Sequence, residues 1–209
     1  MLAVLALVAC GSAKQTETST TTASANGACP PVKAPAPALR HRKRPTAKLD
    51  PAKTYMVTLR TNCGSFSIRL AVKASPRTTA SFVSLVRSRF FDGTVFHRIV
   101  PGFVIQGGDP TATGSGGPGY LTVDRPPATT RYTFGLVAMA KTQTQPAGTS
   151  GSQFFVVTGA DVGLPPDYAV LGEVVSGLPV VRKIGKLGDP STERPTELIE
   201  IERATVAVR

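Results

Sequence analysis

Apolar and polar residues alternate with a period of two in several short segments from residue 54 onward, which is typical of half-buried β-strands. Tyr55–Arg60 (YMVTLR) and Gly64–Leu70 (GSFSIRL) alternate most clearly, and Asn62-Cys63-Gly64 between them has the composition of a hairpin turn. Further strands are predicted by short apolar runs at 95–105, 134–140, 153–158 and 169–175, and by the segment 197–209. The pattern therefore predicts a mainly β domain.

Two helices are predicted among these strands. Ser75-Pro76 has the pattern of an N-cap followed by proline at the first helical position. The segment that follows places apolar residues at helical spacing, at Phe82, Leu85, Val86 and Phe90. A second short helix is predicted at 177–187 (GLPVVRKIGKL). Many short strands with only two helices indicate a closed antiparallel barrel and argue against a doubly wound α/β fold.

The first 53 residues differ from the rest of the chain. Residues 2–9 (LAVLALVA) lead into Cys10, which resembles a bacterial lipobox, where the chain is cut before a cysteine that carries diacylglycerol. Leu2 follows Met1 with no basic segment, so either the true start lies upstream or the resemblance is accidental. Residues 11–28 are rich in Ser, Thr and Ala, and residues 30–51 in proline, which favours extended chain. We expect a signal segment at 1–9, a lipid-anchored linker at 10–53 and a folded domain at 54–209, outside the cell membrane.

The net charge of +11 invites an interpretation as a nucleic-acid-binding protein. Residues 1–53, however, hold eight basic and two acidic residues, so more than half of the excess lies in one quarter of the chain. The basic run Arg40–Arg44 (RHRKR) lacks interleaved aromatic residues, which argues against nucleic acid as a partner. These charges either meet anionic lipid or wall polymers, or are simply a solvated linker. With no apolar run of about 20 residues, a multi-spanning membrane protein is excluded.

The cysteines and the histidine limit the chemistry available. If Cys10 carries lipid, Cys29 and Cys63 remain as an even pair in an oxidising compartment. A bridge between them would close a loop of about 35 residues and contribute roughly 3–4 kcal/mol; two unpaired thiols are the alternative. With no CxxC pattern and one domain histidine, His97, we expect no metal and no other cofactor. No complete nucleophile elbow or phosphate-binding loop is present either.

Two segments of unusual composition carry a resemblance to a known family. Residues 96–109 (FHRIVPGFVIQGGD) resemble the signature of the cyclophilin-type peptidyl-prolyl isomerases, and residues 151–157 (GSQFFVV) resemble their second signature. The resemblance covers about residues 54–209. It implies an eight-stranded barrel capped by two helices, with isomerase activity toward X-Pro bonds in unfolded or partly folded polypeptides. We expect a monomer that assists the folding of exported proteins.

The resemblance also implies site residues. It assigns catalysis to Arg98, Phe103 and Gln106, where Arg98 stabilises the twisted amide, Phe103 forms a wall of the proline pocket and Gln106 orients the arginine. It assigns contacts with the peptide to His97, Val104, Ala140, Lys141, Gln153, Phe155, Leu164 and Tyr168. His97 is expected to support packing beside the arginine rather than to act as a base, and Ala140 and Lys141 to present mainly backbone. The alternative function is a non-catalytic peptide-binding module or holdase that uses the same groove.

Departures from the family pattern predict weak binding of cyclosporin. Gly163 stands where many eukaryotic members carry the tryptophan that contacts this inhibitor, and Tyr168 stands where they carry histidine. Lys141 replaces the usual asparagine, and the loop 142–150 after it runs about three residues longer than in the family. We expect titration of the isomerase with cyclosporin to show no nanomolar inhibition; inhibition in the nanomolar range would refute the prediction.

Overall fold

The computed structural model describes residues 29–209, so the predicted signal segment and Cys10 lie outside the described residues. The elements are β1 (Tyr55–Thr61), β2 (Gly64–Leu70), α1 (Pro76–Arg87), β3 (Thr94–Val95), β4 (Arg98–Val100), β5 (Val104–Gly107), β6 (Thr122–Val123), β7 (Leu136–Met139), β8 (Thr149–Ser150), β9 (Phe154–Val157), β10 (Val170–Ser176), α2 (Leu178–Gly185) and β11 (Glu200–Val208). Neither helix in this part of the chain is long and apolar enough to cross a membrane.

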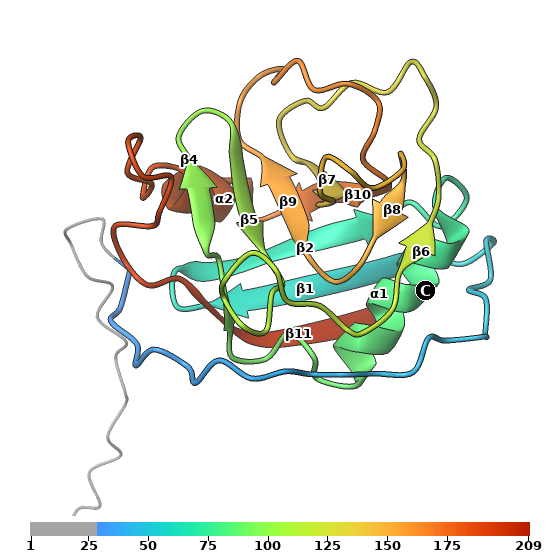
Figure 1. Cartoon of the computed structure of the whole chain (residues 1–209), viewed down its shortest axis with the longest axis horizontal. Helices are drawn as coiled ribbons and strands as arrows, with labels where there is room; N and C mark the ends of the chain where they lie inside the picture. The colour runs from blue at the N-terminus through green and yellow to red at the C-terminus, as the bar shows by residue number, and fades with distance from the viewer. Residues whose placement is uncertain (1–28) are drawn as a thin grey trace, which may run out of the picture.

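Nine of the strands form one curled antiparallel sheet, in the order β3-β11-β1-β2-β10-β7-β9-β5-β4, and β6 pairs with β8 (Figure 1). The mainly β fold with two helices is therefore confirmed. The strand count differs from the expected eight, and among the described strands the edge strands β3 and β4 do not pair with each other. Only Phe96 and His97 separate these two short strands, and Val95 forms its bridge with Asp109 instead. The sheet is thus a half-barrel whose ends approach without joining.

Aromatic rings fill the inside of the curled sheet. Phe154 on β9 is fully buried, with its ring centroid 5.6 Å from that of Phe82 on α1 and 6.0 Å from those of Phe91 and Phe96. All four apolar residues predicted for the first helix are buried. Ser75 is the N-cap of α1, but its side chain makes no capping bond. The backbone N–H of Thr78 instead donates to Asp124 Oδ2 at 2.6 Å, so a residue distant in sequence caps the helix.

Residues 29–48, which we call the strap, lie along the outside of the domain without helix or strand (Figure 1). A disulfide joins Cys29 to Cys63, with 4.7 Å between their Cα atoms. Farther along, Ala38 N donates to the carbonyl of Pro110 at 3.0 Å, and Arg42 N to that of Pro118 at 2.9 Å. We expected a tether over 10–53; its described part is extended, as its prolines predict, but is attached to the domain.

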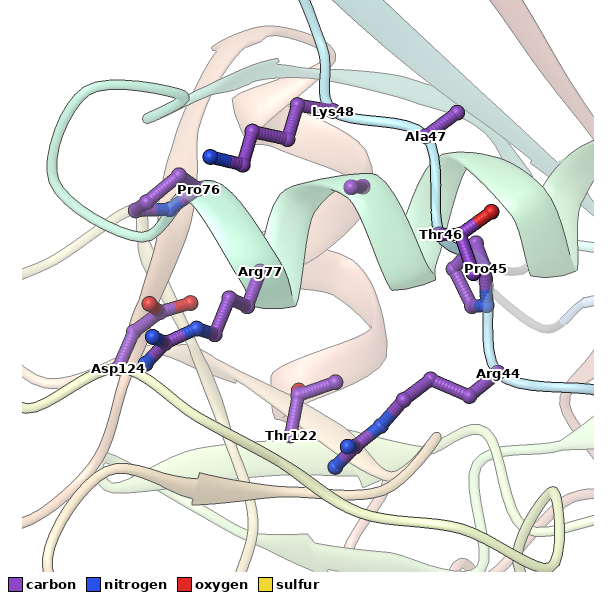
Figure 2. Close-up of a pocket in the computed structure, with 10 residues that line it drawn as sticks. Arg44, Pro45, Thr46, Ala47, Lys48, Pro76, Arg77, Thr122 and Asp124 are labelled. Carbon is purple, nitrogen blue, oxygen red and sulfur yellow. The ribbon is translucent and has the colours of Figure 1, made fainter.

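A cavity of about 490 Å³ separates the strap from the first turns of α1. Figure 2 shows Arg44 and Lys48 reaching into this region from the strap, with Arg77 of α1 and Asp124 nearby. The residues that line it include none of the predicted site residues. The strap therefore contacts the domain on the α1 side without closing tightly over it.

Candidate functional site

The two signature segments form three neighbouring strands, β4, β5 and β9. Arg98 on β4 lies opposite Gln106 on β5, and Gln106 lies opposite Phe155 on β9. Because residues directly opposite each other in an antiparallel sheet share a face, these three side chains lie on one face, in a row across the strands. Segments about fifty residues apart in sequence thus form one surface.

Arg98 is held at the edge of this row by a carboxylate that the sequence did not single out. Its Nε donates to Glu193 Oε2 at 2.6 Å, and its guanidinium carbon lies 5.9 Å from the centroid of the Phe103 ring. The hydrogen bond from Arg98 lowers the pKa of Glu193. Glu193 is fixed in turn, because its carbonyl accepts from Ile99 N at 2.9 Å and its N–H donates to Asp189 O at 2.8 Å. The Arg98 side chain remains about one-third exposed.

Gln106 has a different partner from the one expected. Its Nε2 donates to Gln153 Oε1 at 3.1 Å, whereas the Arg98 side chain donates to Glu193. Gln153 in turn donates to the carbonyls of Gly114 and Gly116, at 2.8 and 3.0 Å. The two glutamines therefore connect the row of site residues to the glycine-rich loop, while Glu193 orients the arginine.

The glycine-rich loop is anchored by Asp109, the last residue of the first signature. Its buried carboxylate accepts from the N–H and the hydroxyl of Thr111, at 2.7 and 2.8 Å, and from Gly116 N at 3.0 Å. Burial would raise the pKa of Asp109, but these hydrogen bonds outweigh it and lower the pKa. The loop is thus held by two residues: the buried Asp109 carboxylate and the side chain of Gln153, which is one of the site residues.

The predicted apolar contacts gather in one cluster beside the row. Val104 and Phe155 are buried in it, and Phe103, Ala140, Leu164 and Tyr168 pack against them while partly exposed. Tyr132, which the sequence analysis missed, is fully buried beneath, with its ring centroid 6.3 Å from Phe155 and 5.9 Å from Tyr168. The partly exposed members offer an apolar face to a ligand, whereas Phe155 and Tyr132 support that face from inside.

The hydroxyl of Tyr132 binds both the carbonyl and the N–H of Tyr168. It donates to Tyr168 O at 2.7 Å and accepts from Tyr168 N at 2.9 Å. Burial raises the pKa of Tyr132 to about 12, so the hydroxyl stays protonated and can donate at neutral pH. One buried side chain therefore sets the position of a predicted substrate contact.

We predict that Tyr132→Phe lowers the free energy of unfolding by about 1–3 kcal/mol, because it leaves two backbone groups of Tyr168 without their partner. It should also raise KM for a proline peptide more than it lowers kcat. The control is Tyr55→Phe, which removes a hydroxyl that serves only the exposed Asp50 N–H. Urea denaturation and NMR exchange kinetics measure both effects; equal losses in the two variants would contradict the prediction.

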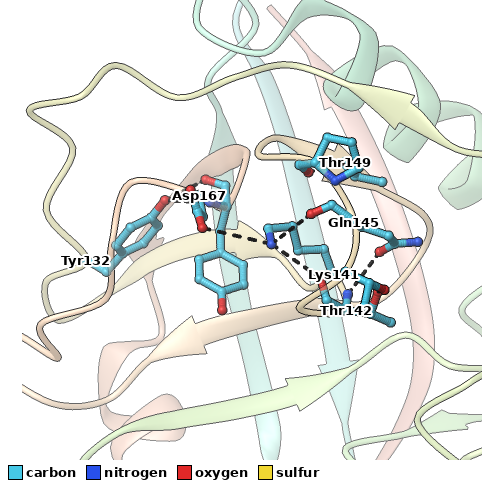
Figure 3. A network of polar contacts seen from close by, with 9 residues as sticks. Tyr132, Lys141, Thr142, Gln145, Thr149 and Asp167 are labelled. Carbon is cyan, nitrogen blue, oxygen red and sulfur yellow. Dashed lines mark hydrogen bonds and ion pairs between the residues drawn. The ribbon is translucent and has the colours of Figure 1, made fainter.

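Lys141 is turned inward, with only 5% of its side chain exposed. Its Nζ donates to the carbonyls of Gln145 and Thr142, at 3.1 and 3.3 Å, and lies 4.0 Å from Asp167 Oδ2 (Figure 3). The ammonium also lies 5.4 Å from the centroid of the Tyr168 ring. The lysine that departs from the family pattern thus ties the loop after it to the loop that carries Tyr168.

His97 lies beside the arginine, but it is not built as a base. Both of its ring nitrogens are buried without a hydrogen-bond partner among residues 29–209. Burial lowers the pKa of His97, although the nearby Asp109 carboxylate acts in the opposite direction. The ring is therefore neutral at neutral pH, which agrees with the packing role expected for it.

The lowered pKa of His97 predicts a pH-dependent stability. The unfolded chain binds the proton first, near pH 6.5, so the stabilisation is complete above about that pH and is lost as pH falls toward the folded-state pKa. We expect the free energy of unfolding to fall between about pH 7 and pH 5, and His97→Gln to flatten this slope. His41→Gln, which removes the exposed histidine, should retain it. Denaturant titrations at several pH values measure the slope. An unchanged slope in His97→Gln would contradict the assignment of the pH dependence to His97.

Gly163 occupies an open position in the structure. Its φ is +63°, and a Cβ added there would meet nothing within 4 Å. The place expected for an inhibitor-contacting indole is therefore unfilled by neighbouring atoms. No cluster of three or more His, Cys, Asp or Glu side chains suited to a metal is found within residues 29–209.

Comparisons with known proteins point to one family. Residues 56–206 match the family described as "Cyclophilin type peptidyl-prolyl cis-trans isomerase/CLD". The chain is 37% identical over 176 residues to peptidyl-prolyl cis-trans isomerase A of Mycobacterium tuberculosis, which covers 76% of this chain and 95% of that protein. It is 37% identical over 177 residues to isomerase B of Streptomyces anulatus, covering 76% and 99%. A crystal structure of a cyclophilin-type isomerase from Cryptosporidium parvum superposes with a TM-score of 0.67 at 28% identity, covering 74% of this chain and 98% of that one.

Proposed function

Because this chain belongs to the cyclophilin-type peptidyl-prolyl cis-trans isomerases, and is such an isomerase, we propose that Arg98 carries its catalysis. The barrier to rotation about a peptide bond is about 18–20 kcal/mol, because the nitrogen lone pair is delocalised into the carbonyl. In the twisted amide the nitrogen regains that lone pair and can accept a hydrogen bond. A fixed guanidinium that donates to this nitrogen stabilises the transition state more than either ground state.

The observation that carries this proposal is the row of Arg98, Gln106 and Phe155 beside the apolar cluster. The proline ring packs on the exposed faces of Phe103, Leu164 and Tyr168, and the amide then lies along the row. Glu193 uses the Nε of Arg98, which leaves the terminal Nη groups for the substrate. The permanent charge of arginine means that no group has to titrate.

A rotation of this kind transfers no proton, which gives a direct test. We expect the wild-type protein to isomerise a proline peptide at the same rate in H₂O and in D₂O, after correction for viscosity, when measured by NMR exchange. A slower viscosity-corrected rate in D₂O would show proton transfer in the limiting step. It would then favour a general acid or base over Arg98.

We also propose that the protein acts outside the cell membrane, anchored through lipid on Cys10, and isomerises X-Pro bonds of exported proteins as they fold. The disulfide between Cys29 and Cys63 supports an oxidising compartment. The apolar run 2–9 before Cys10 supports the anchor. Mass spectrometry of the membrane fraction should find a diacylated N-terminal Cys10. A soluble chain that retains Met1 would overturn both the anchor and the compartment.

A further inference from the structure

The glycine-rich loop, which we define as residues 110–119, follows the first signature segment and is costly to hold in one shape. Four of its ten residues are glycine, and glycine loses more conformational freedom on ordering than any other residue. The loop contains no helix or strand, so it has no regular ladder of hydrogen bonds of its own. Its order therefore depends on contacts with neighbouring parts of the chain.

The strap binds this loop near both of its ends. Ala38 N donates to the carbonyl of Pro110 at 3.0 Å, and Arg42 N donates to the carbonyl of Pro118 at 2.9 Å. The part of the strap between these two donors contains no helix or strand. Together the two bonds fix the start and the end of the loop relative to one short segment of chain.

That segment is held in register by Arg40, which lies midway between the two bonds. Arg40 Nη1 donates to the carbonyls of Phe90 and Asp92, at 2.5 and 2.7 Å. Phe90 is fully buried, so its carbonyl belongs to a part of the chain that the core holds in place. The strap is therefore fixed by the body of the domain, independently of the loop, and can serve as a support for it.

The loop in turn fixes a glutamine of the site. Gln153 Nε2 donates to the carbonyls of Gly114 and Gly116, and Gln153 Oε1 accepts from Gln106 Nε2. Without the two carbonyls the Gln153 amide is free to turn about its last torsion, which is soft, and would then point a donor at the donor of Gln106. The middle of the loop thus orients Gln153, and through it Gln106, which lies opposite Arg98.

We propose that the strap is a positioning segment of the isomerase. By holding both ends of the glycine-rich loop, it keeps the carbonyls in the middle of the loop in place for Gln153, and so maintains the binding of the peptide. This inference rests on the proposed function and deepens it. Residues 29–48 precede the segment 56–206 that matches the family, so the support comes from outside that segment.

The test is a pair of proline substitutions in the strap of the full chain. Ala38→Pro removes the N–H that donates to Pro110 O, in an extended segment that already contains prolines. Ala36→Pro is the matched control, because Ala36 is also exposed and its N–H has no partner among residues 29–209. NMR exchange on a proline peptide gives kcat and KM. We expect Ala38→Pro to raise KM by about 5-fold at nearly constant kcat, and Ala36→Pro to change neither.

Arg40 gives a second variant, and hydrogen exchange gives a direct view of the loop. Arg40→Ala releases the register of the strap and should raise KM by about 10-fold. Arg40→Lys should recover part of this, because an ammonium can donate to the same carbonyls. The Gly116 N–H, which donates to Asp109 Oδ2, should exchange faster in Ala38→Pro and Arg40→Ala than in the wild type and the control.

A Gln153→Ala background separates positioning from a general loss of stability. If the strap acts through Gln153, Ala38→Pro should raise KM no further in that background. An unchanged KM in Ala38→Pro and Arg40→Ala, or an equal rise with and without the Gln153 side chain, would overturn the proposal. The proposed catalysis is tested by kcat of Arg98→Ala, so the two proposals can fail separately.

Discussion

Replacing Arg98 by alanine is expected to lower kcat/KM for isomerisation by about 10²–10³-fold, the usual cost of removing one preorganised donor from a transition state. KM should change little, because the apolar cluster proposed to bind the proline ring is untouched. Arg98→Lys should recover only part of the loss, since an ammonium retains the charge without the planar fork of donors. A protease-coupled assay with a proline peptide measures all three proteins. An Arg98→Ala variant as fast as the wild type would defeat the proposed mechanism.

The same variant tests the role of Glu193 as a positioning residue. If its carboxylate acts only by holding the Nε of Arg98, then Glu193→Gln should cost a smaller factor in the wild-type background. It should cost nothing further when Arg98 is already alanine, because the group that it positions is gone. The matched control is Glu202→Gln, which breaks an exposed ion pair with Arg60 on the sheet. An equal loss of rate from Glu193→Gln in both backgrounds would contradict the assignment.

Local patterns predicted most of the fold because each element has a signal within a few residues. The alternation in 55–60 and 64–70 places β1 and β2, and the spacing of Phe82, Leu85 and Val86 places α1. The same spacing predicts a helix that continues through Phe90, but α1 ends at Arg87. The closing of the sheet has no such signal. Whether β3 and β4 pair depends on how Phe96 and His97 turn the chain between two very short strands, which is decided by packing rather than by pattern.

The residues of the site also fall into two groups: those with a local signal in the sequence and those without one. The signature segments predicted Arg98, Gln106 and Phe155, because β4, β5 and β9 bring those segments into register. Glu193 lies 95 residues from Arg98, in a polar loop where a glutamate looks like any solvated residue. The strap was missed for a similar reason. Prolines predict extended chain, but its attachments are backbone carbonyls of distant loops, which no residue type reveals.

Phe154→Ala is expected to have the largest effect on stability, lowering the free energy of unfolding by about 3–5 kcal/mol. The ring is fully buried and meets Phe82, Phe91 and Phe96 edge-on, at interplanar angles of 87°, 85° and 83°. Removing it opens a cavity whose walls belong to α1 and to the segment after it, as well as to β9, so a single shift cannot fill it. Urea denaturation of the oxidised protein measures the change.

The control for this prediction is Phe134→Ala, which deletes the same ring from a partly exposed position stacked on Arg182. It should cost no more than about 2 kcal/mol, because solvent can fill the space left behind. Equal costs in the two variants would show that the Phe154 ring is not the centre of the core. Phe154 is also the first residue of β9, directly between Gln153 and Phe155, so its ring anchors the backbone on either side of which two residues of the site lie. Phe154→Ala should therefore lower kcat/KM even at temperatures where the variant is fully folded, whereas Phe134→Ala should not.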